Sequence, residues 1–442
     1  MLLFLLSAWT VEIVTATTSP PDFLCPVIVL DSLENPYILV PRRRTAQTNY
    51  LLLFSKEGGM WVADTFEFNQ SVLHPYSLDM AIDLDNRVTV VYTIYQPRAI
   101  IIAQKNNSGW LKDTIDTCWS SWNSIAITSS GVPHIVYQPS GLIYAFRMDS
   151  LIWQKTLVDS YIYTESGCAI DLDEQNQPHI SYFKMASNMG DNLWYATRIG
   201  NQWYCIEIDT PNVPNWNATL IHHGLDNLPH IVYTPSAGMW YAYNDSVWHS
   251  EYLGSGQIYS QKSLDLDCLG QPYILSTISN LTLLTYKDFT GWHSEELPLT
   301  PTTTKGRAGS LFIGRDDIIH IARFATDSNY PPYCEIHYIY GRPEGIEERK
   351  RLKVEGKGLK LMVLPSIVRD NAQIQYTIPE RQRISLDLYD IIGRKVKTIA
   401  QGCVEPGIYS YRFDSSDLSS GVYFLVLESE RESRTRKLLI AR

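Results

Sequence analysis

The 442-residue sequence is poor in charged residues and has no long apolar run. Asp, Glu, Lys and Arg together make up only 19%, below the usual quarter of a globular protein. The formal net charge is −10, which argues against a nucleic-acid partner because such a partner favours a basic surface. No segment stays apolar for 18 residues, so we expect no membrane span.

Cysteine patterning is equally uninformative. The seven cysteines form no CxxC pair, and their odd number leaves at least one unpaired within the chain. We expect small buried hydrophobes, with one or two cross-links open if the protein is exported. The positions are Cys25, Cys118, Cys168, Cys205, Cys268, Cys334 and Cys403.

Catalytic and metal-binding signatures are also missing. We find no Gly-rich phosphate loop, no HExxH and no G-x-S-x-G motif. Asp-Leu-Asp occurs three times, beginning at Asp83, Asp171 and Asp265, but no calcium-loop pattern follows it. These pairs are predicted to form turns, and we predict no metal and no cofactor. The sequence therefore favours a non-catalytic role.

What the chain does have is one phrase repeated seven times before residue 341. An apolar run leads into a polar turn, then Pro-His-Ile-x-Tyr or a variant, then a Tyr-rich run and a Trp. Intervals between equivalent positions are 52, 45, 45, 51, 43 and 47 residues. These positions are Tyr37, Thr89, His134, His179, His230, Tyr273 and His320, and the tryptophans are Trp61, Trp110, Trp153, Trp203, Trp248 and Trp292.

A period in the forties that holds four short strands is typical of a β-propeller, whose blades must stack to bury both faces. We therefore predict an all-β chain: a seven-bladed β-propeller over residues 23–341, followed by a linker at 342–358. Residues 359–442 read as short strands separated by Gly turns, which favours an immunoglobulin-like β-sandwich. The charge changes at the same place, since residues 349–442 carry +7 and the rest −17.

The connections of the repeat differ in length on its two sides. The first-to-second and third-to-fourth strand turns are short, whereas the other connections vary, as in 41–48, 184–192 and 300–307. Function on a rigid β scaffold usually lies on such loops. Candidate ligand-binding residues are therefore the tryptophans outside the repeat and one basic cluster. The alternative for the tryptophans is that they cap apolar gaps between neighbouring blades. The alternative for the basic cluster is a solvated loop. These residues are Trp119, Trp122, Trp216, Arg42, Arg43 and Arg44.

The repeated histidines are predicted to be structural. His134, His179, His230 and His320 hold equivalent positions on different blades, so they are spread around the ring and cannot converge on one metal. Thr and Tyr at the same position in other repeats fit a tolerant packing site.

Residues 1–22 support two interpretations. MLLFLLSAW could be the apolar part of a signal peptide, although it lacks a basic start and contains Glu12 shortly after. Alternatively, Trp9-Thr-Val-Glu matches the outer-strand phrase Trp248-His-Ser-Glu, and the seventh repeat lacks that strand. The N-terminal segment could then close the ring and remove an exposed edge.

The tail contains an ordered set of motifs. Ile384-Ser-Leu-Asp-Leu-Tyr-Asp-Ile-Ile-Gly-Arg-Lys-Val resembles the core of C-terminal sorting domains of the type IX (Por) secretion system. So do Pro406-Gly-Ile-Tyr, Asp417-Leu-Ser-Ser-Gly-Val-Tyr-Phe and the ending from Thr435 to Arg442, whereas Leu364-Pro-Ser-Ile stands where such tails usually carry Asn-Pro-Phe. The flagellar-hook-capping immunoglobulin-like module is a near relative of this pattern. The region before it resembles sialidase-like and lectin-like propellers only in style, because the S-x-D-x-G-x-x-W boxes are absent.

The resemblance implies export across the outer membrane, with the secretion machinery as a partner of the tail. We therefore expect a secreted or surface-bound bacterial protein that recognises carbohydrate or a surface protein through its loop-rich face. Two alternatives stay open: a glycoside hydrolase or lyase on the same scaffold, and a structural module of a surface or adhesion assembly.

Overall fold

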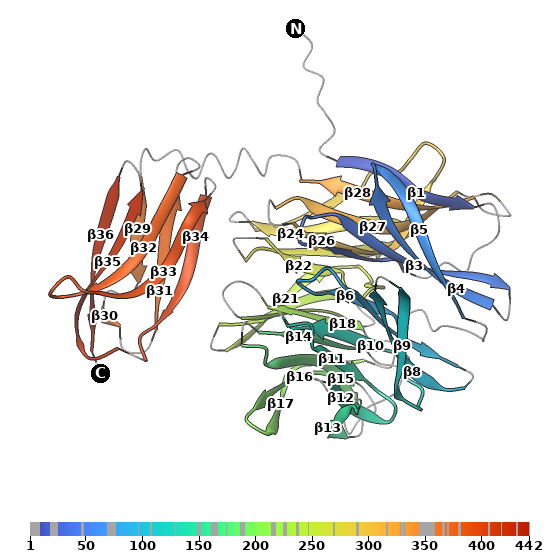
Figure 1. The fold of residues 1–442 in the computed structure, drawn as a ribbon, viewed down its shortest axis with the longest axis horizontal. Coiled ribbons are helices and arrows are strands. Elements are labelled where there is room, and N and C mark those ends of the chain that lie inside the picture. The colour runs from blue at the N-terminus through green and yellow to red at the C-terminus, as the bar shows by residue number, and fades with distance from the viewer. Residues whose placement is uncertain are drawn as a thin grey trace, which may run out of the picture. The chain divides into compact units, whose positions relative to one another are not determined.

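The computed structural model is built of β-strands throughout its described part (Figure 1). It describes residues 9–343 and 359–441 with gaps. The gaps are 18–24, 46–47, 69–76, 96, 107, 129, 148–151, 161–166, 174, 186–190, 214–217, 224–227, 236–237, 246, 268–269, 289–290, 315–316, 328, 330–332, 365–366, 369–370, 379–381, 405–406, 417 and 430–431. Within these residues no helix is long and apolar enough to cross a membrane. The chain divides into two compact units, the first ending at Arg342 and the second beginning at Pro343.

The first unit contains seven four-stranded antiparallel sheets. Six are formed by consecutive strands. The first sheet contains β2 Val27–Leu30, β3 Pro36–Thr45, β4 Thr48–Glu57 and β5 Met60–Phe68. The second contains β6 Asp79–Ile82, β7 Val88–Ile94, β8 Ala99–Asn106 and β9 Gly109–Asp116. The third contains β10 Asn123–Ile127, β11 Pro133–Tyr137, β12 Gly141–Phe146 and β13 Gln154–Ser160. The next three are β14 Cys168–Leu172, β15 Pro178–Met185, β16 Asp191–Ile199 and β17 Gln202–Val213; β18 Ala218–His223, β19 Pro229–Thr234, β20 Met239–Asn244 and β21 Trp248–Gly254; and β22 Leu264–Leu266, β23 Pro272–Ile278, β24 Leu281–Asp288 and β25 Gly291–Glu296.

The seventh sheet joins the two ends of the first unit. Its order is β1 Trp9–Thr17, β28 Cys334–Gly341, β27 Ile319–Thr326 and β26 Lys305–Ile313. β1 runs antiparallel to β28, from Trp9 opposite Gly341 to Thr17 opposite Cys334, and the two strands lie side by side in Figure 1. This is the strand that the closing interpretation of the N-terminus requires. Whether residues 9–17 are retained in the exported protein stays a prediction.

The first strands of successive sheets contact one another: β2 lies against β6, β6 against β10, β10 against β14, and so on through β18 and β22 to β26, which contacts β2. Apolar side chains fill the space between neighbouring sheets. Val29 and Leu53 of the first sheet, for example, share a cluster with Met80 and Val90 of the second. A side chain buried between two sheets contributes about 1.5–3 kcal/mol relative to an exposed one, so each sheet depends on its neighbours.

The turn between the first two strands has one design in most sheets. A carboxylate or hydroxyl at its start accepts the backbone N–H of the residue four positions later, as Asp83 does from Arg87 at 2.9 Å. The same bond occurs at Asp31, Thr128, Asp173 and Asp267. The residue three after the start has positive φ, which Gly and Asn tolerate best. These residues are Glu34, Asn86, Gly131, Asn176, Gly270 and Asp317.

The repeated tryptophans link neighbouring sheets through their indole N–H groups. Five of them donate to a carboxylate on the fourth strand of the preceding sheet: Trp61 to Glu12 (3.1 Å), Trp110 to Asp64 (3.1 Å), Trp153 to Asp113 (3.1 Å), Trp292 to Glu251 (2.5 Å) and Trp9 to Glu295 (2.7 Å). Each carboxylate lies three residues after the tryptophan of its own strand. A cation also pairs with four of these carboxylates: Lys56, Lys105, Arg147 and Lys287.

β1 makes this link on both of its sides. Trp9 donates to Glu295 of the sixth sheet, and Glu12 accepts from Trp61 and pairs with Lys56 of the first sheet. Val14 is buried in the cluster shared by the seventh and first sheets. The N-terminal strand therefore has the same contacts as the fourth strand of the other sheets.

The second unit has two sheets around one core. β29 Lys360–Leu364, β31 Asn371–Ile378 and β34 Gly407–Asp414 form the smaller sheet. The larger contains β30 Ile367–Val368, β36 Ser433–Ile440, β35 Gly421–Ser429, β32 Gln382–Asp390 and β33 Lys395–Val404, with β30 parallel to β36. Alternate residues of β31 are buried, as the period of two in its sequence predicts, and they join Leu386, Leu425 and Leu427 in the core.

Five cysteines are free thiols: Cys25, Cys118, Cys168, Cys205 and Cys334. Cys25, Cys168 and Cys334 are buried, and burial raises the pKa of each thiol.

Candidate functional site

A cavity of about 720 Å³ lies among the variable connections of the first unit. Its lining comes from the β19–β20, β21–β22 and β23–β24 connections, from the start of β18, from β26 and from the residue before β10. The lining residues are Trp122, Ala218, Thr234, Pro235, Gly238, Ser255, Gly256, Gln257, Ile258, Tyr259, Thr277, Ile278, Ser279, Asn280 and Arg307.

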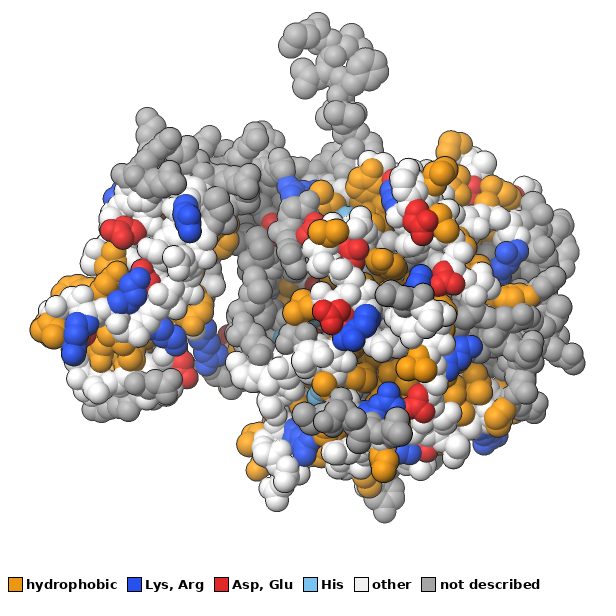
Figure 2. All heavy atoms as spheres, in the orientation of Figure 1, with side chains coloured by type: hydrophobic (Ala, Val, Ile, Leu, Met, Phe, Trp, Pro, Cys, Tyr) orange, Lys and Arg blue, Asp and Glu red, His pale blue; other side chains and the backbone are white. Residues whose placement is uncertain are grey.

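The described lining is polar but carries a single charged side chain, that of Arg307. Half of the other lining residues have hydroxyl or amide side chains, and Tyr259 donates its O–H to Gln257 Oε1. Burial raises the pKa of Tyr259, and the nearby Arg307 opposes that rise. No described lining residue is Asp or Glu. Figure 2 shows positive and negative side chains scattered over the visible face rather than gathered by sign.

Backbone contacts fix the connections that line this cavity. Gln257 and Thr277 exchange two backbone hydrogen bonds of 3.0 and 2.9 Å, which join the β21–β22 connection to β23. Gly306 N–H donates to the Asn280 carbonyl at 2.9 Å. Gly238 has a φ of +149°, and a Cβ there would lie 2.6 Å from the Tyr252 ring, so this turn requires glycine.

The predicted tryptophans have different environments. Trp122 lines the cavity, but it is only 4% exposed and belongs to the core between sheets. Trp119 packs edge-on against Tyr95, with 5.3 Å between ring centroids, and is not part of the cavity lining. Trp216 lies outside the described residues.

The predicted basic loop is part of a strand. β3 extends to Thr45 and β4 begins at Thr48, so the expectation of an inserted loop from residue 41 is wrong for 41–45. The backbone there continues the ladder, with Arg42 opposite Tyr50 and Arg43 opposite Asn49. Arg42 Nη2 lies 3.5 Å from Thr17 Oγ1. The side chains of Arg43 and Arg44 lie outside the described part.

Sequence reasoning missed Tyr259, Gln257, Asn280 and Arg307. A usable signal existed for Arg307, since it ends the long connection at 300–307. The β21–β22 connection gave no such signal, because its residues are small and polar like those of any loop.

The repeated histidines bond to tyrosines of the third strand in their own sheets. His134 Nδ1 lies 2.6 Å from the Tyr144 hydroxyl, and His320 Nδ1 lies 2.6 Å from that of Tyr338. His179 pairs likewise with Tyr195, and His230 with Tyr241. Burial lowers the pKa of His134 and of His179 to about 4, so each ring is neutral and its Nδ1 accepts a hydrogen bond from the tyrosine O–H.

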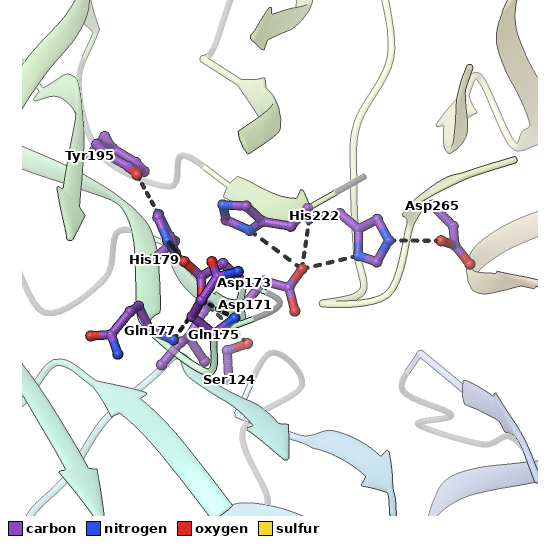
Figure 3. A network of polar contacts seen from close by, with 11 residues as sticks. Ser124, Asp171, Asp173, Gln175, Gln177, His179, Tyr195, His222 and Asp265 are labelled. Carbon is purple, nitrogen blue, oxygen red and sulfur yellow. Dashed lines mark hydrogen bonds and ion pairs between the residues drawn. The ribbon is translucent and has the colours of Figure 1, made fainter. Parts of the chain in front are cut away.

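A second polar cluster joins the first strands of three successive sheets (Figure 3). His222 of β18 lies between Asp171 of β14, with Nδ1 3.2 Å from Oδ2, and Asp265 of β22, with Nε2 3.1 Å from Oδ1. Asp171 also accepts the His223 backbone N–H at 2.7 Å, and Asp265 accepts that of Ile313 at 2.7 Å.

The electrostatics of this cluster favour a charged histidine. Burial alone would lower the pKa of His222, but the carboxylates of Asp265 and Asp171 outweigh it and raise that pKa to about 9. Burial opposes ionisation of Asp171, yet His222 and His223 hold its pKa well below the ordinary range. Burial raises the pKa of Asp265. The cluster is an ion pair between sheets, worth most while His222 keeps its proton.

The Asp-Leu-Asp interpretation is therefore only half correct. Asp83, Asp173 and Asp267 start turns, as predicted. Asp171 and Asp265 are strand residues that contact His222, and the prediction of a turn role is wrong for them. Among the described residues, no group of three or more His, Cys, Asp and Glu is placed to hold a metal ion.

A third cluster lies fully buried in the seventh sheet. Arg323 donates to His337 Nδ1 at 3.3–3.4 Å, and His337 Nε2 lies 2.6 Å from Glu335 Oε2. Burial and Arg323 lower the pKa of His337 to about 4. The same residues hold the β25–β26 connection: Arg323 bonds the carbonyls of Leu297 and Pro298, and Glu335 accepts from Thr300 and Thr302.

The comparison with protein families identifies the second unit. Residues 363–441 match the secretion system C-terminal sorting domain. The prediction of a type IX sorting domain in the tail is confirmed by this match. The sorting domain indicates a bacterial protein that is exported and either secreted or held at the cell surface.

Solved structures are similar to this chain at low sequence identity. A fungal alcohol oxidase of the AA5 family matches at 10% identity and a TM-score of 0.51, over 98% of this chain and 99% of that one. PorZ, a surface component of the type IX secretion system of Porphyromonas gingivalis, matches at 10% identity and 0.43, over 92% and 58%. AofleA from Arthrobotrys oligospora matches at 10% and 0.46, over 66% and 90%. No curated protein matches the sequence.

Proposed function

We propose that this exported protein is a non-catalytic carbohydrate-binding protein that takes its ligand in the cavity beside Tyr259. Its first unit would be a seven-bladed propeller and its second an immunoglobulin-like sandwich. Support for the propeller comes from the seven four-stranded sheets and from inner-strand contacts that return from β26 to β2. The two sheets of the second unit around one core favour the sandwich.

The observation that carries the proposal is the chemistry of the lining. Hydroxyl and amide groups of Thr234, Ser255, Gln257 and Asn280 can exchange hydrogen bonds with sugar hydroxyls, and the Tyr259 ring offers an apolar face. A hydrolase would need two carboxylates about 5–10 Å apart at the site. The described lining has none, so the binding role is favoured.

A glycan array probed with the full chain tests this proposal. Wild-type protein should give a restricted set of hits, and Tyr259→Ala should weaken them at least ten-fold because the stacking face and one hydroxyl are lost. Trp119→Ala is the matched control, since Trp119 packs on Tyr95 away from the cavity lining, and it should leave the hits unchanged.

If Trp119→Ala weakened the hits and Tyr259→Ala left them unchanged, the ligand would bind elsewhere, on the surface formed by Trp119 and Tyr95. An array without hits would favour a protein partner or a structural surface module. Release of reducing ends or unsaturated products from a bound glycan would establish the hydrolase or lyase alternative. Thermal melts of both variants verify that each is folded.

A further inference from the structure

We propose that the ligand of this cavity is an anionic saccharide whose carboxylate or sulfate group binds the Arg307 guanidinium. This inference rests on the proposed carbohydrate function and narrows it to one chemical class. Arg307 is exposed and is the single charged side chain of the described lining. Arginine suits this role because its planar N–H groups match carboxylate and sulfate oxygens in pairs.

No acidic side chain among the described residues pairs with Arg307. Lys56, Lys105, Arg147 and Lys287 each pair with a carboxylate, and Lys184 pairs with Asp159. Within the described part of the chain, Arg307 acts electrostatically on Tyr259 and opposes the rise in its pKa that burial causes. Arg307 is therefore an exposed positive charge in a part of the chain, residues 1–348, whose net charge is −17. Its charge is available to a ligand.

The strand that carries Arg307 is firmly anchored. The preceding connection is held by the buried Arg323 and Glu335, through the Leu297 carbonyl at 3.2 Å and through the hydroxyls of Thr300 and Thr302. On the other side, Gly306 N–H donates to the Asn280 carbonyl of the lining. A bulge between Arg307 and Gly309 interrupts the ladder with β27. Bulges commonly redirect a side chain beside a functional site.

The neighbours of Arg307 suit a sugar rather than a small inorganic anion. Tyr259 is close enough to Arg307 for the guanidinium to affect its pKa, and Gln257, Ser279 and Asn280 supply amide and hydroxyl groups to the same cavity. A volume of about 720 Å³ admits a short oligosaccharide. Because the first unit has a negative net charge, it disfavours a polyanion that is attracted by charge alone. Selective binding of an anionic saccharide therefore requires both the contacts to the sugar and the charge of Arg307.

Matched polysaccharide pairs test the inference. The full chain is titrated with polygalacturonate and alginate, each beside its carboxyl-reduced counterpart, and with dextran sulfate beside dextran. We expect at least ten-fold tighter binding to one charged member than to its neutral partner. A preference within the first two pairs identifies a uronate, and one within the third identifies a sulfate ester.

Two variants locate the effect. Arg307→Gln should abolish the preference for the charged member while leaving the weaker binding of the neutral one intact. Arg98→Gln is the control, because Arg98 lies in the β7–β8 connection of the second sheet, over the Tyr95 ring and outside the cavity lining. It should behave as wild type.

Equal binding of charged and neutral members, unchanged by Arg307→Gln, would overturn the anionic inference and leave the carbohydrate proposal standing. A charge preference that survives in Arg307→Gln would overturn the role of Arg307. Absence of binding to all six polysaccharides together with an array lacking hits would overturn both proposals.

Discussion

At the residue scale, Arg198 and Trp203 show what a single missing carboxylate changes. In five sheets a carboxylate three residues after the tryptophan accepts an indole N–H from the next sheet. The third sheet has Thr156 at that position, and both Trp203 Nε1 and Arg198 Nε are buried without a partner. Buried donors left unpaired lower stability by about 1–3 kcal/mol each.

Thr156→Glu should therefore stabilise the protein. Its carboxylate would accept from Trp203 and Arg198, as Glu251 accepts from Trp292 and Lys287, and should raise the free energy of unfolding by about 1 kcal/mol. Urea denaturation measures the change. Thr156→Gln, of equal size without the charge, should gain less than half as much. A midpoint no higher than that of the wild type would contradict the assigned role of the carboxylate.

Because of His222, we expect the free energy of unfolding to depend on pH between about 6.5 and 9. Its folded-state pKa of about 9 exceeds the unfolded value of about 6.5, so its contribution is complete below pH 6.5 and is lost as pH rises through 9. His222→Gln cannot carry the charge and leaves Asp171 and Asp265 facing an uncharged side chain. The variant should be less stable than wild type at pH 6.5, and the difference should shrink by pH 9.5.

Unfolding free energies from urea denaturation at the two pH values measure this difference. The control is His249→Gln, which removes a partly exposed histidine paired with Asp245. If the gap between wild type and His222→Gln stays constant from pH 6.5 to 9.5, His222 does not hold its proton as the cluster requires.

At the element scale, β1 is the strand with the greatest consequence. A chain beginning at Thr18 loses the pairing with β28, the burial of Val14 and two tryptophan–carboxylate links. We expect its melting temperature to fall by about 10 °C, because several kcal/mol are lost from a unit of this size. It should also associate through the exposed β28 edge. Calorimetry and size-exclusion chromatography measure the two effects.

A chain beginning at Trp9 is the control, since it retains β1 and should melt as the full chain does. Equal melting of the Thr18 and Trp9 chains would show that β1 adds nothing to the first unit. The mass of the exported protein then decides between the two interpretations of the N-terminus.

The elements were largely predictable from the sequence, and their exceptions have a physical reason. The repeated Pro-His-Ile-x-Tyr phrase located the second strand of the sheets, since His134, His179, His230 and His320 lie in β11, β15, β19 and β27. The cluster of Arg42, Arg43 and Arg44 resembles a loop in composition but lies in β3. Cross-strand pairing with β4 determines its conformation, and composition does not reveal pairing.

At the scale of the whole molecule, the site was the least predictable part. The cavity draws on residues from 122 to 307, which no short motif connects. The export signal was predictable because its motifs are contiguous within residues 363–441. The predicted role of Trp122 in ligand binding stays a prediction, because this side chain lines the cavity but is also buried in the core between sheets. Its burial shows that a tryptophan outside a repeat can be structural as well.

The placement of β1 also sets an order for maturation. Its partner β28 ends at Gly341, and the sorting-domain match begins at residue 363. Residues 9–17 can therefore pair only when the last strand of the first unit is present. A polypeptide that is only partly exported lacks β28, the strand with which residues 9–17 pair. The sorting domain therefore follows β28, the strand that pairs with β1, in the chain.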